Sequence, residues 1–354
     1  MKPLIYFVHY SSKPGGIEVL LPTIINEFKD WKVKVFVIRP PKEKDESVYK
    51  DIPVDIEYGS RSTLIALWKF FMLALKNDKA IFHLFNTGPF FLFVLRLTGV
   101  KKIIYSIHGT IYWRTVFQKL VRKPFWLLAN SNKIVFTSNS AYSGSVFNKK
   151  ILQSVNVRKI YNPIDLNRFN TSGINKSNKE EMKIIFVGRL AEGKNLFHWI
   201  ETAEYLMENG IKAVFHVYGA GELQNEIEQR IKKSKYYENI KLDGHVTNIE
   251  EIYKKSDLFL FLSEYESFGN VAVESVLCGV PVIAFNIPAL EEVFCDFPVF
   301  LIDKNKSTAE QVLNKVNQMD ELRSAADKAS IDFKIRFGAK QHLDQLSNIY
   351  RDFE

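Results

Sequence analysis

Cysteine is scarce in this sequence of 354 residues, in which only Cys278 and Cys295 occur. Two cysteines give no disulfide framework of the kind that holds small secreted domains together, so that class of protein is excluded. Both lie in apolar stretches, and we expect both to be reduced core residues of a cytoplasmic protein.

A hydrophobic run long enough to cross a bilayer is also lacking. The longest apolar stretch, LIALWKFFMLAL at residues 64–75, is interrupted by Lys69, whereas a spanning helix needs about 20 apolar residues. The stretch LIYFVHY at residues 4–10 is followed at once by polar residues, which predicts a first strand and not a signal peptide. We therefore expect no integral membrane segment.

Negative charge is missing from a long central part of the sequence. No Asp or Glu lies between Asp78 and Asp165, although Lys and Arg recur throughout that interval. Residues 1–165 carry 25 Lys and Arg against 11 Asp and Glu, and the remaining residues carry 23 against 29. A basic half joined to an acidic half favours an anionic partner for the first half, although an imbalance without function is the alternative.

Apolar runs of strand length alternate with amphipathic helical stretches along the whole chain, which predicts parallel sheets covered by helices. The expected helices cover residues 19–29, 196–209 and 223–235. The expected strands cover residues 4–10, 32–38, 80–85, 102–108, 133–138, 183–190, 213–221, 240–245, 257–263 and 280–285.

The length and one break in this alternation predict two domains. The Asn-Pro pair within residues 158–170, with the polar stretch after it, is typical of a linker. We expect an α/β fold with two Rossmann-like doubly wound domains, residues 1–165 and residues 166–333, facing each other across a cleft. A final helix at residues 334–354 is expected to pack back toward the first domain.

Two loops at strand ends carry candidate functional residues in the first half. Gly15 and Gly16 precede a predicted helix, where bare backbone N–H groups can approach a phosphate. His108 follows a predicted strand, and an imidazole there can bind a hydroxyl or stabilise charge near reacting atoms. Ordinary turn chemistry and an imidazole satisfied by a nearby carbonyl are the alternatives.

Two further loops carry candidates in the second half. Arg189 and Lys194 lie five residues apart across a glycine-containing turn, and two such cations suit a diphosphate. Glu266 and Glu274 flank a predicted helix start near Asn270, where N–H groups can receive phosphate or sugar oxygens. Solvated surface charges are the alternative for both pairs.

The segment EYESFGNVAVESVLCGVPVIA at residues 264–284 resembles the E-x7-E segment of retaining glycosyltransferases of the GT-B fold, in particular glycosyltransferase family 4. FVGRLAEGKN is similar to the phosphate loop of that family, and YNPIDLNRF is similar to the segment that enters its second domain. VYGAGEL, IKLDGHV and KPGGIE resemble further glycine-containing segments of the family, in the expected order.

The resemblance implies a role for each candidate. Glu274 would bind the ribose of a nucleotide sugar such as a UDP-sugar, and Glu266 would contact hydroxyls of the donor sugar. Arg189 and Lys194 would bind its diphosphate. Further contacts would come from backbone groups of the helix start, from the glycine loop and from the histidine near the donor sugar: Phe268, Gly269, Asn270, Val271, Gly15, Gly16 and His108.

The expected activity is that of a retaining hexosyltransferase, with His108, Glu266, Arg189 and Lys194 as candidate catalytic residues. It would transfer a sugar to a glycan or lipid-linked acceptor in polysaccharide biosynthesis for the cell envelope. We expect no cofactor and no metal, and the sequence has no Asp-x-Asp motif. Pro288 with Ala289, where the family often has two glycines, departs from the pattern on the sugar side, and so does Asn162-Pro163 in the interdomain segment.

Residues Trp113–Lys123 form a basic amphipathic stretch, with Trp113, Val116, Phe117, Leu120 and Val121 on one face. This pattern favours peripheral contact with an anionic membrane on the inner face of the plasma membrane, and an ordinary core-covering helix is the alternative.

Three other functions remain as alternatives. A nucleotide-sugar epimerase of the same shape is the nearest. An anion-binding or nucleic-acid-binding protein would explain the basic half, but no nucleic-acid motif is visible and we expect no nucleic-acid partner. A dinucleotide oxidoreductase needs G-x-G-x-x-G after the first strand, and GAGELQ in mid-chain lacks the third glycine.

Overall fold

The protein is described by a computed structural model, which forms two compact units. Unit 1 comprises Met1–Ile164 together with Ala339–Glu354, and unit 2 comprises Asp165–Gly338. The structure describes residues 3–11, 16–18, 20–28, 31–41, 49, 52–112, 115–130, 133–153, 155–173 and 181–353.

Unit 1 is built on a seven-stranded sheet with the order β3-β2-β1-β4-β5-β6-β7, in which every pairing is parallel. Because β1 neighbours both β2 and β4, the direction of winding reverses between β1 and β4. The strands are β1 (Leu4–Ser11), β2 (Lys32–Arg39), β3 (Asp55–Tyr58), β4 (Ile81–Phe85), β5 (Ile103–Ile107), β6 (Ile134–Ser138) and β7 (Val157–Lys159).

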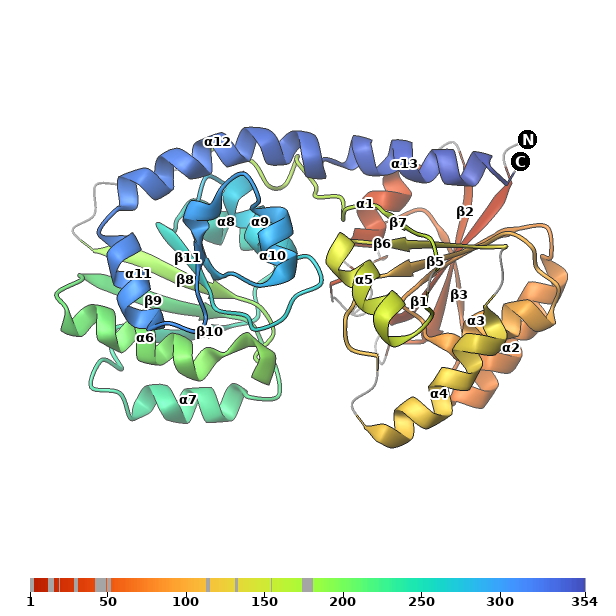
Figure 1. The fold of residues 1–354 in the computed structure, drawn as a ribbon, viewed down its shortest axis with the longest axis horizontal. Helices are drawn as coiled ribbons and strands as arrows, with labels where there is room; N and C mark the ends of the chain where they lie inside the picture. Colours follow the sequence, from red (N-terminus) through yellow and green to blue (C-terminus); the bar gives the residue numbers. More distant parts are fainter. Residues whose placement is uncertain are drawn as a thin grey trace. The chain divides into compact units, whose positions relative to one another are not determined.

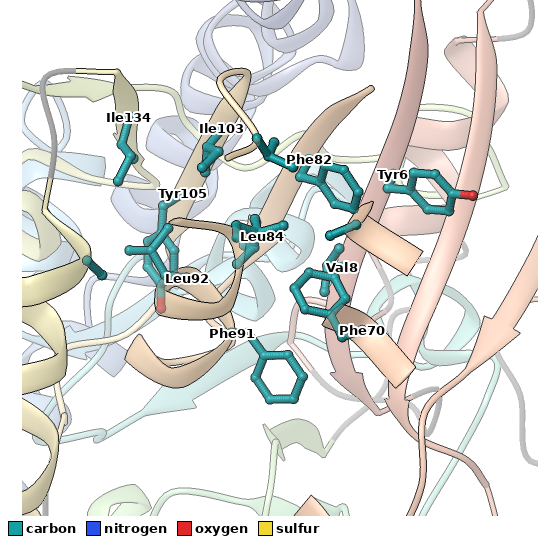
Figure 2. Close-up of a cluster of buried hydrophobic side chains, with 14 of the residues drawn as sticks. Tyr6, Val8, Phe70, Phe82, Leu84, Phe91, Leu92, Ile103, Tyr105 and Ile134 are labelled. Carbon is teal, nitrogen blue, oxygen red and sulfur yellow. The ribbon is translucent and has the colours of Figure 1, made fainter. Parts of the chain in front are cut away.

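Helices cover both faces of this sheet (Figure 1). Side chains of α2, α3, α4 and α5 share one core cluster with the sheet, and side chains of α1 and α13 share the other. Figure 2 shows part of the first cluster, with Phe70 and Phe91 packed near Phe82 and Leu84. The helices are α1 (Leu20–Glu27), α2 (Thr63–Lys76), α3 (Pro89–Leu97), α4 (Val116–Ala129), α5 (Ala141–Lys150) and α13 (Ala339–Arg351).

The central strands of unit 1 are buried along their whole length, as expected of parallel strands covered on both sides. His83 is the polar exception in β4, and its ring is satisfied on both sides. Its Nδ1 lies 2.7 Å from the hydroxyl of Tyr350, and its Nε2 lies 2.6 Å from Oγ of Ser106. A buried polar group of this kind is tolerated because it is hydrogen-bonded.

Helix α13 therefore belongs to the core of unit 1. Leu346, Ile349 and Tyr350 are buried in the α1 side of the sheet. Nδ1–H of His342 donates to the carbonyl oxygen of Tyr161 at 2.7 Å. Residues 334–337, which we expected in the last helix, instead end the preceding helix α12 (Met319–Phe337).

Unit 2 repeats the parallel design with the strand order β10-β9-β8-β11-β12-β13. Its winding reverses between β8 and β11. The strands are β8 (Met182–Val187), β9 (Ala213–Tyr218), β10 (Ile240–Gly244), β11 (Leu258–Phe261), β12 (Val282–Phe285) and β13 (Leu301–Ile302).

The helices of unit 2 pack in two groups, α6 with α7 and α11, and α9 with α8 and α12 (Figure 1). Trp199 of α6 is fully buried, and its indole N–H donates to the carbonyl oxygen of Leu260 at 3.0 Å. The remaining helices of the unit are α6 (Leu196–Glu208), α7 (Gln224–Lys232), α8 (Ile249–Lys254), α9 (Asn270–Leu277), α10 (Pro288–Val293) and α11 (Thr308–Val316).

The cysteine prediction is half correct. Cys278 is a buried free thiol, whereas Cys295 is an exposed free thiol whose Sγ–H donates to Asp296. Within the described ranges, no helix combines the length and the apolarity that crossing a membrane requires.

Candidate functional site

The loops after β8 and β11 lie where the winding of the unit 2 sheet reverses. Ligands of open α/β sheets bind beyond the carboxyl ends of the strands at such a reversal. The loop after β8 carries Arg189 and Lys194, and the segment after β11 carries Glu266 and leads into α9. The loops that carry Arg189, Lys194, Glu266 and the start of α9 therefore follow two adjacent strands of the sheet.

Lys194 and Glu266 contact each other directly. Lys194 ends a turn of 3-10 helix, Glu192–Lys194, and its Nζ donates to Oε1 of Glu266. The two side chains are only 22% and 15% exposed, so the pair is partly withdrawn from water and is screened less than a surface ion pair. The cation and the acid expected on neighbouring parts of one ligand are thus adjacent before any ligand binds.

Gly193 allows the two loops to come this close. A Cβ atom at Gly193 would lie 2.3 Å from Cε2 of Tyr265. The backbone N–H of Glu264 donates to the carbonyl oxygen of Gly193 at 3.1 Å. A larger residue at 193 would displace the exposed ring of Tyr265, so glycine lets the two loops pack in the arrangement that holds Lys194 beside Glu266.

The start of α9 is fixed by Gly269 and Phe268. Gly269 has a φ of 95°, and a Cβ atom there would lie 2.6 Å from Cδ2 of Leu290. Phe268 is buried, with its ring packed edge-on against Phe337 at 5.2 Å between centroids. This arrangement aims the first turn of α9, Asn270 and Val271 included, beyond the carboxyl end of β11, where helix N–H groups favour anions.

Glu274 lies one turn inside α9 and is half-buried. Burial raises the pKa of its carboxyl to about 7; the nearby Arg168 opposes this rise and Glu250 adds to it. Among the described residues, no hydrogen-bond donor reaches the Glu274 carboxylate. Its oxygens therefore keep their capacity to accept hydrogen bonds from a ligand.

Arg168 and Glu250 are members of this neighbourhood that the sequence did not point to. Nε of Arg168 donates to Oε2 of Glu250 at 2.8 Å, and its Nη2 donates to the carbonyl oxygen of Thr247 at 2.6 Å. The guanidinium is held by these partners and acts on Glu274 through its charge. The sequence offered one sign of this contact, which is that Arg168 lies in the segment YNPIDLNRF that leads into unit 2.

Arg189 is exposed at the end of β8 and forms no ion pair with any described residue. The backbone on either side of it is fixed by the loop after β9. The N–H of Gly188 donates to Tyr218 at 3.0 Å, and that of Leu190 donates to Ala220 at 3.1 Å. The exposed guanidinium therefore extends from a hydrogen-bonded backbone, which suits a cation that meets a ligand.

In unit 1, His108 follows β5 directly and is half-buried. Burial, with a contribution from the neighbouring His342, lowers its pKa to about 3, although a hydrogen bond with the side chain of Asn162 opposes this. The imidazole is neutral at ordinary pH, so it can exchange hydrogen bonds but does not supply a positive charge.

The remaining residues of unit 1 are only partly described. Gly16 lies in the loop that follows β1, whereas Gly15 lies outside the described residues, as do Trp113 and Arg114. The buried His9 at the end of β1 was not predicted, and its Nε2 lies 2.7 Å from the hydroxyl of Tyr49. A histidine within an apolar strand run was the only sequence signal for it.

A surface hollow of unit 2 lies away from this site. A surface hollow of about 690 Å³ lies at the amino ends of β8, β9 and β10, near Lys212 and Asn239, and therefore at the end of the sheet opposite to the reversal loops. In the described part of the chain, no three His, Cys, Asp or Glu side chains are grouped so as to hold a metal ion.

Two family models together match most of the chain. Residues 167–332 match the model described as glycosyl transferases group 1, and residues 14–168 match the model described as glycosyltransferase family 4.

Two relatives cover nearly all of the chain. The UDP-Gal:alpha-D-GlcNAc-diphosphoundecaprenol alpha-1,3-galactosyltransferase of Escherichia coli is 27% identical in an alignment 356 positions long, which covers 93% of this chain and 86% of that protein. The N-acetylgalactosamine-N,N'-diacetylbacillosaminyl-diphospho-undecaprenol 4-alpha-N-acetylgalactosaminyltransferase of Campylobacter jejuni is 25% identical in an alignment 341 positions long, which covers 89% of this chain and 90% of that protein.

Among solved structures, Anabaena Alr3699/HepE in complex with UDP-glucose superposes with a TM-score of 0.83 at 20% identity, over 99% of this chain and 100% of that one. At this identity the likeness shows the fold alone, and that fold is GT-B. From the matched family models, the chain belongs to glycosyltransferase family 4, the group 1 glycosyltransferases, and is a glycosyltransferase of the GT-B fold.

Proposed function

We propose that the enzyme transfers a hexose from a nucleoside-diphosphate sugar to an acceptor hydroxyl with retention at the anomeric carbon. The observation that carries this proposal is the meeting of the Lys194–Glu266 pair with the start of α9 at the reversal of the unit 2 sheet. A cation, an acid and a helix N-terminus in one place suit a ligand with anionic and hydroxyl-rich parts.

Each part of the donor has a partner in this proposal. Lys194 and Arg189 bind the diphosphate with the first turn of α9, from Phe268 to Val271. Glu266 accepts hydrogen bonds from the sugar, and Glu274 accepts them from the ribose. For unit 1, the resemblance to the family adds Gly15, Gly16 and His108 as proposed donor-binding residues.

The chemistry follows from where charge develops. As the glycosidic bond to phosphate breaks, negative charge grows on the leaving diphosphate, and Lys194, Arg189 and the α9 dipole stabilise it. The acceptor hydroxyl attacks the same face of the sugar and gives its proton to a leaving phosphate oxygen. These groups stabilise the leaving group without a metal ion, so we propose a metal-independent enzyme without a cofactor.

We propose a UDP-sugar as donor and a lipid-linked or polysaccharide acceptor of the cell envelope. In support, the names of two relatives include diphosphoundecaprenol acceptors, and one of these names also includes UDP-Gal. With such an acceptor, the location we propose is the cytoplasm at the inner face of the plasma membrane. Residues 113–123 are the contact expected there, and the apolar side chains described for that stretch are exposed.

The donor is tested by thermal denaturation with UDP-, GDP- and ADP-sugars. We expect a UDP-sugar to raise the midpoint for the wild type, and Glu274→Ala to reduce that rise. Glu310→Ala, which removes an exposed acid of unit 2 in α11, is the matched control and is expected to behave as the wild type. Failure of every nucleotide sugar to stabilise the wild type would contradict the proposal.

Epimerase activity is separated from transfer by the product. A transferase releases free nucleoside diphosphate when an acceptor is supplied, whereas an epimerase converts one nucleotide sugar into another without an acceptor. Nucleotide release that does not depend on the acceptor, together with a new nucleotide sugar, would favour the epimerase.

A further inference from the structure

Large exposed apolar side chains gather on the outer side of one helical layer of unit 1. In α4 the exposed ones are Val116, Phe117, Leu120, Val121, Leu127 and Leu128, with exposed fractions from 38% to 74%. The buried residues of the helix are Trp126 and Ala129. At 100° per residue the exposed set lies on one side of the helix and the buried pair lies on the other, so the apolar stripe faces outward.

Helix α2 repeats this arrangement. Its buried residues are Ala66, Phe70, Leu73 and Ala74. Its exposed apolar residues are Leu64, Ile65, Trp68 and Leu75, of which Leu64 is 79% and Trp68 is 63% exposed. Helical spacing again places the exposed set on the side away from the core. The apolar run that forms α2 in the sequence therefore supplies both a core face and an outer face.

The two stripes lie on the same helical layer, with α3 between them. α2 packs against α3, and α3 packs against α4, and all three contribute to the core cluster on the same face of the sheet (Figure 1). We call the exposed residues of α2 and α4 just named the outer apolar surface. Isolated exposed apolar residues are normal on a protein surface, but a contiguous set marks an interaction site.

Charge identifies the partner of this surface. Within residues 63–129 the only acidic residue is Asp78, while exposed lysines flank both stripes. Lys69 and Lys76 lie on α2, and Lys119 and Lys123 lie on α4. An apolar surface bordered by cations fits an anionic lipid bilayer, because acyl chains take the apolar side chains and headgroup phosphates take the lysines. A second copy of the chain would bring lysines against lysines.

We propose that unit 1 binds anionic membranes through α2 and α4 together. This extends the contact expected for residues 113–123 to a second helix that is about 50 residues away in the sequence. The proposal rests on the proposed function, because membrane binding would bring the enzyme to a lipid-linked acceptor. Its test needs neither the donor nor the acceptor.

The test is sedimentation of the full chain with vesicles of phosphatidylcholine alone or of phosphatidylcholine with phosphatidylglycerol. We expect binding to the anionic vesicles that decreases as salt rises. Trp68→Ser and Phe117→Ser are each expected to weaken this binding about tenfold or more, and the double variant should bind as weakly as it does to neutral vesicles. Ile331→Ser, which removes an exposed apolar side chain of unit 2, should bind as the wild type does.

Several results would overturn the proposal. Binding of Trp68→Ser at the wild-type level would leave α4 alone as the contact. Equal binding to neutral and anionic vesicles would remove the role of the lysines. A wild-type dimer in light scattering that the same variants abolish would assign the surface to a second copy. Stabilisation by a UDP-sugar tests the proposed donor separately, so failure of either proposal is recognised without the other.

Discussion

At the scale of single residues, Glu274 is distinctive because its carboxyl is partly protonated near neutral pH. Burial raises the pKa of its carboxyl to about 7, and no donor among the described residues satisfies its oxygens. An ionised carboxylate accepts hydrogen bonds at both oxygens and binds hydroxyl groups more strongly than a protonated carboxyl does. Donor affinity should therefore depend on this titration.

We expect the KM for the donor to rise as the pH falls below about 7, because Glu274 becomes protonated. Glu274→Gln should remove this dependence and raise KM about tenfold or more at high pH, where hydrogen bonds to a charged acceptor are lost. Initial-rate measurements from acidic to alkaline pH check this. Glu310→Gln is the control, and parallel pH profiles for wild type and Glu274→Gln would contradict the assignment.

The same residue makes stability depend on pH. The pKa of Glu274 is raised from 4.5 to about 7 in the folded chain, so the folded chain binds this proton more tightly than the unfolded chain does. Its contribution to the free energy of unfolding is therefore largest below pH 4.5 and decreases as the pH rises toward 7. Glu274→Gln should lose this decrease, which reaches about 3 kcal/mol once the pH is well above 7, and urea denaturation at several pH values measures it.

Sequence alone identified some of these residues and missed others for a physical reason. Lys194, Glu266 and Glu274 stand in short segments next to predicted strands, so the sequence could name them as candidates. Arg168 and Glu250 are 82 residues apart and meet only through tertiary packing. No local pattern encodes that contact.

At the scale of helices and strands, the alternation of apolar runs predicted the central strands. It missed β3 (DIEY) and β7 (VRK), which are short edge strands with exposed residues and little apolar character. The pattern did not predict α2 as a helix. Apolar side chains occupy both its core face and its outer face, so the stretch shows no helical period.

The start of α9 offers a test at this scale. Gly269→Ala places a Cβ at positive φ and against Leu290, so we expect a loss of about 2–4 kcal/mol in the free energy of unfolding and weaker donor binding. Gly210→Ala is a matched control, because Gly210 has a φ of 82° with no atom within 4 Å of the added Cβ. It should cost about 1–2 kcal/mol. Equal losses for the two variants would show that the contact with Leu290 is unimportant.

At the scale of the whole molecule, unit 1 is assembled from both ends of the described chain. The hydrogen bond between His83 and Tyr350 joins residues 267 positions apart, and Arg158 pairs with Asp352 at 3.2 Å. The sequence predicted that a final helix would exist, from the spacing of Leu343, Leu346 and Ile349. Its partners in the sheet could not be predicted, because His83 lies inside an apolar strand.

We expect Tyr350→Phe to destabilise unit 1 by about 1–3 kcal/mol, because it leaves a ring nitrogen of the buried His83 without its partner. Urea unfolding measures the size of this loss. Hydrogen exchange of the backbone amides of β4 shows whether the loss is in unit 1. Tyr237→Phe changes an exposed tyrosine of unit 2 and should alter stability by less than about 0.5 kcal/mol. An unchanged exchange rate in β4 of Tyr350→Phe would mean that α13 is held by its apolar contacts alone.

Because α13 packs in unit 1, the unit that is synthesised first is the last to complete its core. During translation, residues 165–338 contain all that unit 2 needs and can complete their core as soon as they leave the ribosome. Unit 1 is begun first, but one face of its sheet lacks Leu346, Ile349 and Tyr350 until α13 emerges. Until then α1 covers this face without α13, so the nascent amino-terminal half keeps part of its apolar core exposed to solvent.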